Sequence, residues 1–321
     1  MNIWNFILNN LKENKRVILL IVIENKGSSP GRLGFKMAVT NNNEIFGSIG
    51  GGIMEYQMAE FAKNLFKVGE LKPFIKKQIH NTKAKEDQSG MICSGEQSIL
   101  FYPIEPNTEN ITLLEKLVRC VTDNCKSVLS VMPGEIKLID DKQIAGHVIG
   151  EVIDENRWGY HEKISYKNEL YIIGAGHVGL ALSRTMQQLG FYVTIFDNRQ
   201  ALNTLENNTF AHKKQIVDYT KIDKHIPEGQ NVYVVIMTYK HVSDKNVLSK
   251  LLDKKCAYIG LMGSKSKVEK LFAGLIAKGH NSTDLEKVHS PIGISIKSET
   301  PEEIAISIAA EIIMVKNMKK D

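Results

Sequence analysis

Residues 170–179 read LYIIGAGHVG, in which an apolar strand runs directly into the motif G-x-G-x-x-G and then into a helix. This order is typical of a Rossmann-type unit, whose helix N-terminus faces the phosphates of a nucleotide. Gly174 permits the tight turn, Gly176 lets the backbone approach a pyrophosphate, and Gly179 lets the helix pack on the strand. His177 stands between the last two glycines. The stretch predicts a phosphate-binding turn, and the alternative is a Rossmann-like turn that binds no nucleotide.

An acidic residue stands where a Rossmann site usually contacts a ribose. The strand predicted at 192–196 ends in Asp197, which lies 23 residues after Gly174. An acid at this spacing meets a ribose hydroxyl, which favours NAD-like over NADP-like ligands. Arg199 argues in the other direction, because a nearby arginine accommodates a 2′-phosphate. The sequence alone leaves both ligands open.

Beyond residue 170, helices and apolar strands alternate as in a doubly wound parallel sheet. Further buried strands are predicted at 232–237 and 257–261, and Thr300 begins the last helix as its N-cap. His241 and Asp244 follow the strand 232–237, at the edge where such sheets bind ligands. Either residue is a candidate acid, base or metal ligand, and the alternative is that it only caps the next helix.

About 165 residues precede the Rossmann-type motif, enough for a domain with its own core. Their pattern predicts an N-terminal α/β domain, and the polar run 154–168 is the predicted linker. The domains are therefore expected at 1–165 and 166–321. The strands expected in the first domain are 16–23, 36–40, 45–49, 73–80, 98–104 and short antiparallel strands within 126–153, and its helices are 1–15, one that follows residue 52, and 111–121.

A second glycine-rich turn lies in the first domain. The stretch SIGGGIME places Gly50, Gly51 and Gly52 between a strand and a helix. Consecutive glycines leave backbone N–H groups free to point at an anion, with a helix dipole behind them. The loop GSSPGR adds hydroxyls, among them that of Ser28, and the cation of Arg32. Two such anion sites predict a large phosphorylated ligand, and the alternative for the glycines is a plain tight turn.

One cysteine of the four differs in its setting. Cys93 lies in GMICSG at 90–95, a loop flanked by glycines that would present the thiol. A thiolate is a soft ligand, suited to a transition metal or to sulfur transfer. The alternative is an inert buried cysteine, which is the interpretation adopted for Cys120, Cys125 and Cys256. The four form no C-x-x-C pair, so a reducing compartment is expected.

Composition excludes several classes of protein. Lys and Arg total 41 against 36 Asp and Glu, and a net charge of +5 without a basic stripe does not indicate a nucleic-acid-binding surface. The longest early apolar run, 17–23, is too short to span a bilayer. Asparagines interrupt the first ten residues, unlike a secretory signal. A cytoplasmic location, without nucleic-acid or membrane partners, is therefore expected.

Taken together, these stretches resemble the XdhC/CoxI family, the xanthine dehydrogenase accessory proteins. The resemblance covers nearly the whole chain. It rests on GSSP (27–30) with KM (36–37), GSIGGG (47–52) with Glu55, MIC (91–93) with Gly95, GAGHVG (174–179), Asp197 with Arg199, Thr238 with His241 and Asp244, YIGLMGSK (258–265), and PIG (291–293) with TPEEIA (300–305).

The resemblance implies a function and a set of site residues. Such proteins look like non-catalytic carriers that bind the molybdenum cofactor, a pterin dithiolene with a phosphate. They assist its maturation by sulfuration and its insertion into a xanthine dehydrogenase-type molybdenum hydroxylase. A cysteine desulfurase is implied as a further partner, and a homodimer as the assembly. The cofactor contacts expected are Ser28, Arg32, Gly50, Gly51, Gly52, Glu55, Cys93, Gly174, Gly176, His177, Gly179, Asp197 and Arg199, with Cys93 as a ligand of the molybdenum.

Two positions depart from the family pattern. Ser94 stands where a second glycine after the cysteine is usual, and Tyr239 stands where a histidine usually follows the threonine. The second change removes a potential ligand from the loop that carries His241 and Asp244. The competing function is an NAD(P)-dependent oxidoreductase that uses the C-terminal Rossmann domain. The absence of an evident catalytic set and the setting of Cys93 favour the maturation factor.

Overall fold

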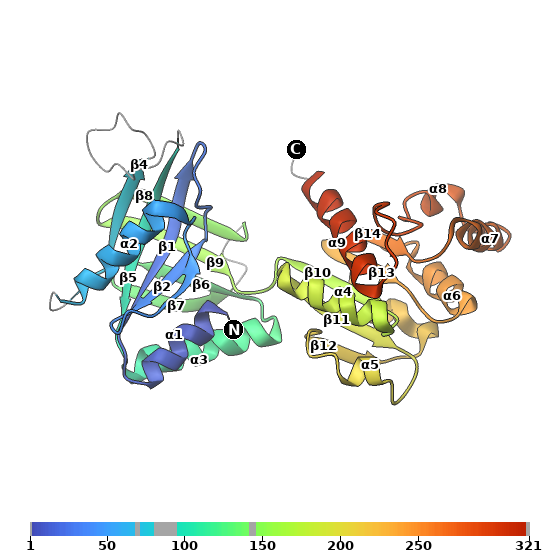
Figure 1. The fold of residues 1–321 in the computed structure, drawn as a ribbon, viewed down its shortest axis with the longest axis horizontal. Helices are drawn as coiled ribbons and strands as arrows, with labels where there is room; N and C mark the ends of the chain where they lie inside the picture. The colour runs from blue at the N-terminus through green and yellow to red at the C-terminus, as the bar shows by residue number, and fades with distance from the viewer. Residues whose placement is uncertain (1, 68–70, 80–94, 141–145, 319–321) are drawn as a thin grey trace. The chain divides into compact units, whose positions relative to one another are not determined.

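The computed structural model describes residues 2–67, 71–79, 95–140 and 146–318 (Figure 1). The chain divides into two compact units, Met1–Ser165 and Tyr166–Asp321, each with its own core. Within the described ranges, no helix is both long enough and apolar enough to cross a membrane.

The first unit contains two antiparallel sheets and three helices. A five-stranded sheet has the order β3-β2-β1-β5-β4, and a four-stranded sheet has the order β7-β6-β9-β8. The helices are α1 (Ile3–Lys12), α2 (Gly52–Leu65) and α3 (Thr108–Asp123). The strands are β1 (Val17–Lys26), β2 (Lys36–Thr40), β3 (Ile45–Ser48), β4 (Phe74–Ile79), β5 (Glu96–Ile104), β6 (Ser127–Met132), β7 (Glu135–Asp140), β8 (Val148–Asp154) and β9 (Arg157–Lys163).

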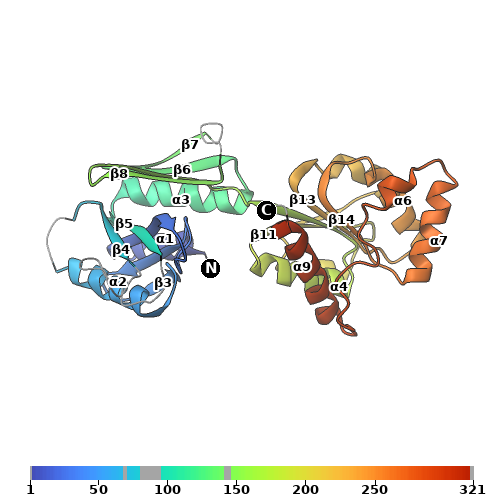
Figure 2. The ribbon, with the colours of Figure 1, turned by 90° about the horizontal axis from the view of Figure 1, so that it is seen from above.

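The central strand β1 is apolar throughout most of its length because both of its faces are covered. Its odd-numbered residues from Val17 to Ile23 belong to a core shared with α1, α3 and the four-stranded sheet. Its even-numbered residues from Ile18 to Val22 pack with the buried face of α2. Figure 2 shows α2 on one side of the five-stranded sheet and α1, α3 and the smaller sheet on the other. The run VILLIVI is therefore explained by a strand between two apolar layers.

The linker predicted at 154–168 is wrong over most of its length. Strand β9 (Arg157–Lys163) occupies it and pairs with both β6 and β8. Trp158 and Tyr160 alternate inward and are buried, although the residues between and around them are polar. The segment that joins the two units is therefore only 164–167.

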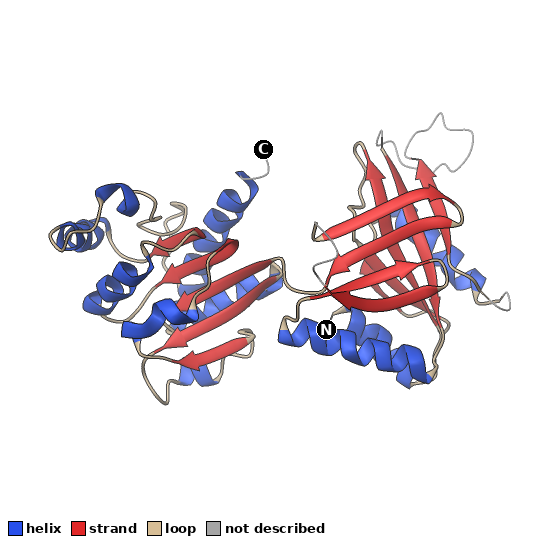
Figure 3. Ribbon diagram, turned by 180° about the vertical axis from the view of Figure 1, so that it is seen from behind, coloured by secondary structure: helices blue, strands red, loops and turns tan. Residues whose placement is uncertain are grey.

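The second unit is the doubly wound parallel sheet expected from the sequence. Its strand order is β12-β11-β10-β13-β14, and all pairs are parallel. Helices cover both faces, as Figure 3 shows, with α4 and α9 on one side and α6 and α7 on the other. The elements are β10 (Asn168–Ile173), α4 (His177–Gln188), β11 (Phe191–Asp197), α5 (Asn203–Glu206), β12 (Lys213–Ile216), the 3-10 helix η2 (Tyr219–His225), β13 (Gly229–Ile236), α6 (His241–Leu251), β14 (Cys256–Leu261), α7 (Lys265–Ile276), α8 (Ser282–Leu285) and α9 (Pro301–Met318).

The order of the strands locates the ligand crevice. The chain moves from β10 to β11 and β12 on one side, and then returns to place β13 and β14 on the other. Parallel sheets of this kind bind ligands outside the carboxyl ends of their strands, at the point where the order reverses. Here that point lies between β10 and β13.

Candidate functional site

The glycine turn after β10 lies at this carboxyl edge, and its glycines differ in their surroundings. A Cβ atom on Gly174, whose φ is +118°, would lie 2.3 Å from the carbonyl oxygen of Met237. A Cβ on Gly179 would lie 2.4 Å from the carbonyl oxygen of Gly174. Gly176 has a φ of −71°, and a Cβ there would meet nothing within 4 Å. Packing therefore explains Gly174 and Gly179, whereas Gly176 borders open space.

Three helices begin at this edge without a side-chain cap. They are α4, α6 and α7, whose N-cap residues are Gly176, Lys240 and Ser264. In contrast, Asn2 and Asn107 cap α1 and α3 with their side-chain oxygens. The first N–H groups of a helix need partners, and uncapped starts are suited to an anion.

The last helix is capped by the box predicted from the sequence. The Glu303 N–H donates to Thr300 Oγ1, and Glu303 Oε2 accepts from the Thr300 N–H, both at 3.2 Å. The long helix α9 therefore has its first turn satisfied by its own side chains.

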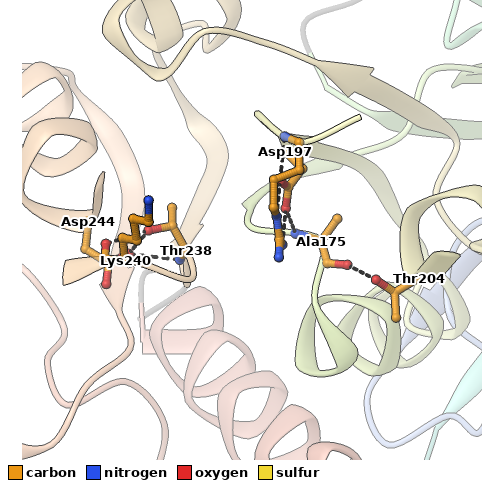
Figure 4. A network of polar contacts seen from close by, with 7 residues as sticks. Ala175, Asp197, Thr204, Thr238, Lys240 and Asp244 are labelled. Atoms are coloured by element: carbon orange, nitrogen blue, oxygen red, sulfur yellow. Dashed lines mark hydrogen bonds and ion pairs between the residues drawn. The ribbon is translucent and has the colours of Figure 1, made fainter. Parts of the chain in front are cut away.

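Asp197 lies at the end of β11 and is fully buried (Figure 4). Its Oδ2 accepts from the Ala175 N–H and from Arg199 Nη2, both at 2.8 Å. Its Oδ1 accepts from the Arg199 backbone N–H at 3.0 Å and from Nε at 2.9 Å. Burial by itself would raise the pKa of Asp197, but these hydrogen bonds outweigh it and lower the pKa below its usual value. The carboxylate thus bonds to its own chain where the sequence indicated a ribose contact.

A cation–π contact extends this arrangement to the next loop. The Arg199 guanidinium lies 4.4 Å from the centroid of the Tyr239 ring, and Lys240 Nζ lies 5.1 Å from it. Tyr239 follows β13 and is half exposed. The side chain that replaces the usual histidine therefore supports an arginine.

Asp244 has a positioning role in the same loop. Its Oδ1 accepts from the Thr238 N–H at 2.8 Å and from Thr238 Oγ1 at 2.6 Å, and its Oδ2 lies 3.5 Å from Lys267 Nζ (Figure 4). Burial raises the pKa of Asp244 despite these partners. His241 is the first residue of α6, and its Nδ1 is buried without a hydrogen-bond partner. Among the described residues, no three metal-ligating side chains gather at one point.

The glycine turn of the first unit already contains an anion. Glu55 Oε2 accepts from Ser48 Oγ at 2.6 Å, from the Ile49 N–H at 2.8 Å and from the Gly51 N–H at 3.0 Å. The Gly50 N–H donates to Ser48 Oγ at 3.2 Å. Burial would raise the pKa of Glu55, but these bonds lower it. The expectation that these amides are free is therefore not met at Gly50 and Gly51, because the chain's own carboxylate binds there.

Gln97 joins this turn to the serine-rich loop, and no sequence motif pointed to it. Its Oε1 accepts from Ser29 Oγ at 2.7 Å and from the Gly31 N–H at 3.1 Å, and its Nε2 donates to the Ile49 carbonyl oxygen at 3.5 Å. The side chain is buried. A buried amide among the apolar residues of β5 was the available signal, since such a group needs partners.

The remaining predicted contacts are surface residues or lie outside the described residues. Ser28 and Arg32 are exposed, and so is His177. A Cβ on Gly95 would lie 2.5 Å from the carbonyl oxygen of Ser28, so the start of β5 packs against the serine-rich loop. Cys93 and Ser94 lie outside the described residues.

Two family models match this chain. A model described as the XdhC Rossmann domain matches residues 170–312, and one described as the XdhC and CoxI family matches residues 11–74. Together they cover most of both units.

Relatives of full or greater length are also similar. The chain is 26% identical over 323 residues to YqeB of Escherichia coli (strain K12), a protein called uncharacterized, with 99% of this chain and 47% of YqeB covered. The chain thus spans about half the length of YqeB. It is 22% identical to a Bacillus subtilis (strain 168) protein whose name describes it as one of the probable subunits of xanthine dehydrogenase, with 95% of each chain covered.

The fold is shared with a solved structure. A crystal structure from Bacillus halodurans, described as a xanthine dehydrogenase, matches with a TM-score of 0.73 at 24% identity. The match covers 98% of this chain and 96% of that one. At this identity the likeness concerns the fold.

Proposed function

Because the chain belongs to the XdhC and CoxI family, we propose that it is an accessory protein of a xanthine dehydrogenase-type molybdenum hydroxylase. Its task in this proposal is to bind the molybdenum cofactor and to assist its sulfuration and insertion. A cysteine desulfurase is the proposed sulfur donor, and a homodimer is the proposed assembly. The name of the Bacillus subtilis relative supports the choice of hydroxylase.

The observation that carries the proposal is the carboxyl edge of the parallel sheet. Three helices begin there without side-chain caps, and Gly176 borders open space. These features fit the phosphate of the cofactor, because backbone N–H groups at helix starts are good partners for a phosphate. We assign the phosphate contact to Gly176 and His177, with Arg199 beside them. The bound cofactor would supply molybdenum and its two dithiolene sulfurs for the partner's chemistry.

The first unit is assigned the other contacts. Ser28 and Arg32 are exposed next to the serine-rich loop, where they can donate to an anion. A phosphate that enters the turn at Gly50–Gly52 would exchange with the Glu55 carboxylate, which accepts from the same N–H groups. Cys93 is assigned the contact to sulfur or to molybdenum, because a thiolate is a soft ligand.

The competing activity is nicotinamide-dependent oxidoreduction by the second unit. The Rossmann-type unit is what favours it. Asp197 argues against it, since this carboxylate accepts four hydrogen bonds from its own chain and not from a ribose.

A deletion strain of the host tests the proposal. We expect the partner hydroxylase to fold but to lack functional molybdenum cofactor, measured as its molybdenum content and its activity. Cys93→Ser should fail to restore activity. Cys256→Ser is the matched control and should restore it, because burial raises the pKa of Cys256 to about 11 and leaves an inert thiol.

Two results would contradict this function. One is normal hydroxylase activity in the deletion strain. The other is rapid, saturable NADH oxidation by the purified protein with a panel of carbonyl acceptors, which would favour the oxidoreductase. Full activity with Cys93→Ser would remove only the role of that thiol.

A further inference from the structure

We propose that Asp197, Arg199 and Tyr239, here called the Arg199 cluster, close the nucleoside side of the crevice and exclude NAD-type dinucleotides. The inference uses the proposed function in one respect only, that the ligand binds at the carboxyl edge of the parallel sheet. It deepens that function by naming the ligand class, a phosphomonoester without a nucleoside.

The first step is the hydrogen bonding of the carboxylate. A carboxylate accepts about four hydrogen bonds, two at each oxygen. Asp197 accepts four, from the Ala175 N–H and from three N–H groups of Arg199. A dinucleotide bound in the usual way donates its ribose hydroxyls to an acid at this position. In this chain, a ribose would have to displace the Arg199 side chain.

The second step is the path of the arginine. Strand β10 lies between β11 and β13 in the sheet, and the glycine turn leaves its end. Arg199 follows β11 and Tyr239 follows β13, yet the guanidinium lies 4.4 Å from the ring centroid. The contact therefore crosses the end of β10. Asp197 fixes the guanidinium from one side by a two-pronged hydrogen bond, and the ring supports it from the other.

The third step is what the cluster leaves available. A guanidinium has five N–H groups, and Arg199 Nε and Nη2 each donate one to Asp197. The side chain keeps one third of its surface exposed. The other N–H groups can donate to a phosphate at Gly176, the turn residue that borders open space. Arg199 thus recognises the phosphate of a small ligand and excludes the nucleoside of a large one.

Calorimetric titration of the full chain with NAD⁺ and with phenyl phosphate tests this inference. The wild type should bind phenyl phosphate and show no saturable binding of NAD⁺. Arg199→Ala should free one acceptor position on each oxygen of Asp197 and raise the affinity for NAD⁺ at least about tenfold, which is about 1.4 kcal/mol. The same variant should weaken phenyl phosphate binding.

Two further variants separate recognition from loss of fold. Tyr239→Leu removes the ring but no charge and should raise NAD⁺ affinity less than Arg199→Ala does, whereas Tyr239→Phe should behave as the wild type. Arg184→Ala, which removes an exposed arginine from α4, is the matched control and should change neither affinity. Circular dichroism establishes that each variant is folded.

The inference is overturned if the wild type binds NAD⁺ and Arg199→Ala weakens that binding, because Arg199 would then be part of a dinucleotide site. It is also overturned if neither protein binds NAD⁺, because the cluster would then not be what excludes it. Both outcomes concern the purified protein alone. They are therefore distinct from a failure to support the hydroxylase in the deletion strain.

Discussion

Gly176 differs from the other glycines of its motif in what its missing side chain leaves free. Gly174 and Gly179 each prevent a clash with a backbone oxygen of the same unit. No atom of the chain needs the space beside Gly176, and its φ of −71° is open to any residue. One sequence motif therefore combines two packing requirements with one position that suits a ligand.

This difference makes the motif testable one glycine at a time. Gly176→Val should lower the free energy of unfolding by less than about 1 kcal/mol, because an N-cap valine is only mildly unfavourable. It should weaken phenyl phosphate binding at least tenfold. Gly179→Ala should instead cost about 1–3 kcal/mol through overpacking against Gly174. Urea unfolding and calorimetry measure the two effects, and unchanged phosphate affinity in Gly176→Val would mean that the turn is purely structural.

At this scale the sequence located the residues better than their partners. The motifs point to Asp197 and Glu55, and each does lie at a glycine turn. Their hydrogen bonds could not be predicted, because the Ala175 N–H comes from a neighbouring strand end and the angle of approach depends on the twist of the sheet. The strain expected at Gly176 is absent, since a motif does not give the φ of each glycine.

At the scale of elements, His212 joins three segments of the second unit. Its Nδ1 accepts from the Val193 N–H at 3.0 Å, and its Nε2 lies 2.9 Å from the Tyr166 hydroxyl. Its ring stacks on that of Tyr192, with centroids 4.8 Å apart. Burial lowers the pKa of His212 below 6.5. Protonation of Nδ1 would also break the bond to Val193, so the neutral ring is the folded form.

This histidine makes the stability of the second unit depend on pH. The unfolded chain binds a proton near pH 6.5, and the folded chain resists it. The contribution is therefore complete above pH 6.5 and is lost as the pH falls below it, by at most about 1.4 kcal/mol per pH unit. His212→Asn keeps an acceptor that does not titrate. Urea unfolding at pH 7.5 and pH 5 should show a smaller loss for this variant, and equal losses would exclude His212 as the cause.

Regular elements followed from the sequence, and edge or polar ones did not. The buried strands β10, β13 and β14 and the capping box of α9 are confirmed. Strand β9 has the polar composition of a linker, although Trp158 and Tyr160 carry the alternation of a strand. Strand β12 was not predicted, since KKQI is short and charged, as edge strands often are.

At the scale of the whole molecule, the fold class was predictable because two apolar patterns occur in succession. Buried strands with intervening helices gave the parallel sheet, and shorter alternating strands gave the antiparallel ones. Ligand identity was not predictable in this way, because the same fold carries many functions. It depends on single side chains such as Arg199 and Tyr239, whose contact joins two loops 40 residues apart in the sequence.

The distribution of tryptophan allows the two units to be followed separately. Both tryptophans, Trp4 and Trp158, lie in the first unit. Phenyl phosphate at 100 times its Kd should add about 2.7 kcal/mol to the stability of the unit that binds it. We expect the ligand to raise the thermal transition seen by circular dichroism and to leave the tryptophan fluorescence transition unchanged. A shift of the fluorescence transition alone would place the binding site in the first unit.

The uncapped starts of α4, α6 and α7 have a consequence for the lifetime of the protein in the cell. A ligand that fills them completes hydrogen bonding that the chain leaves unfinished, so the unliganded second unit opens more often. Proteases act on opened chains, and a change of 1–2 kcal/mol alters abundance about several-fold. The amount of this protein would then follow the supply of its ligand, without a separate regulator.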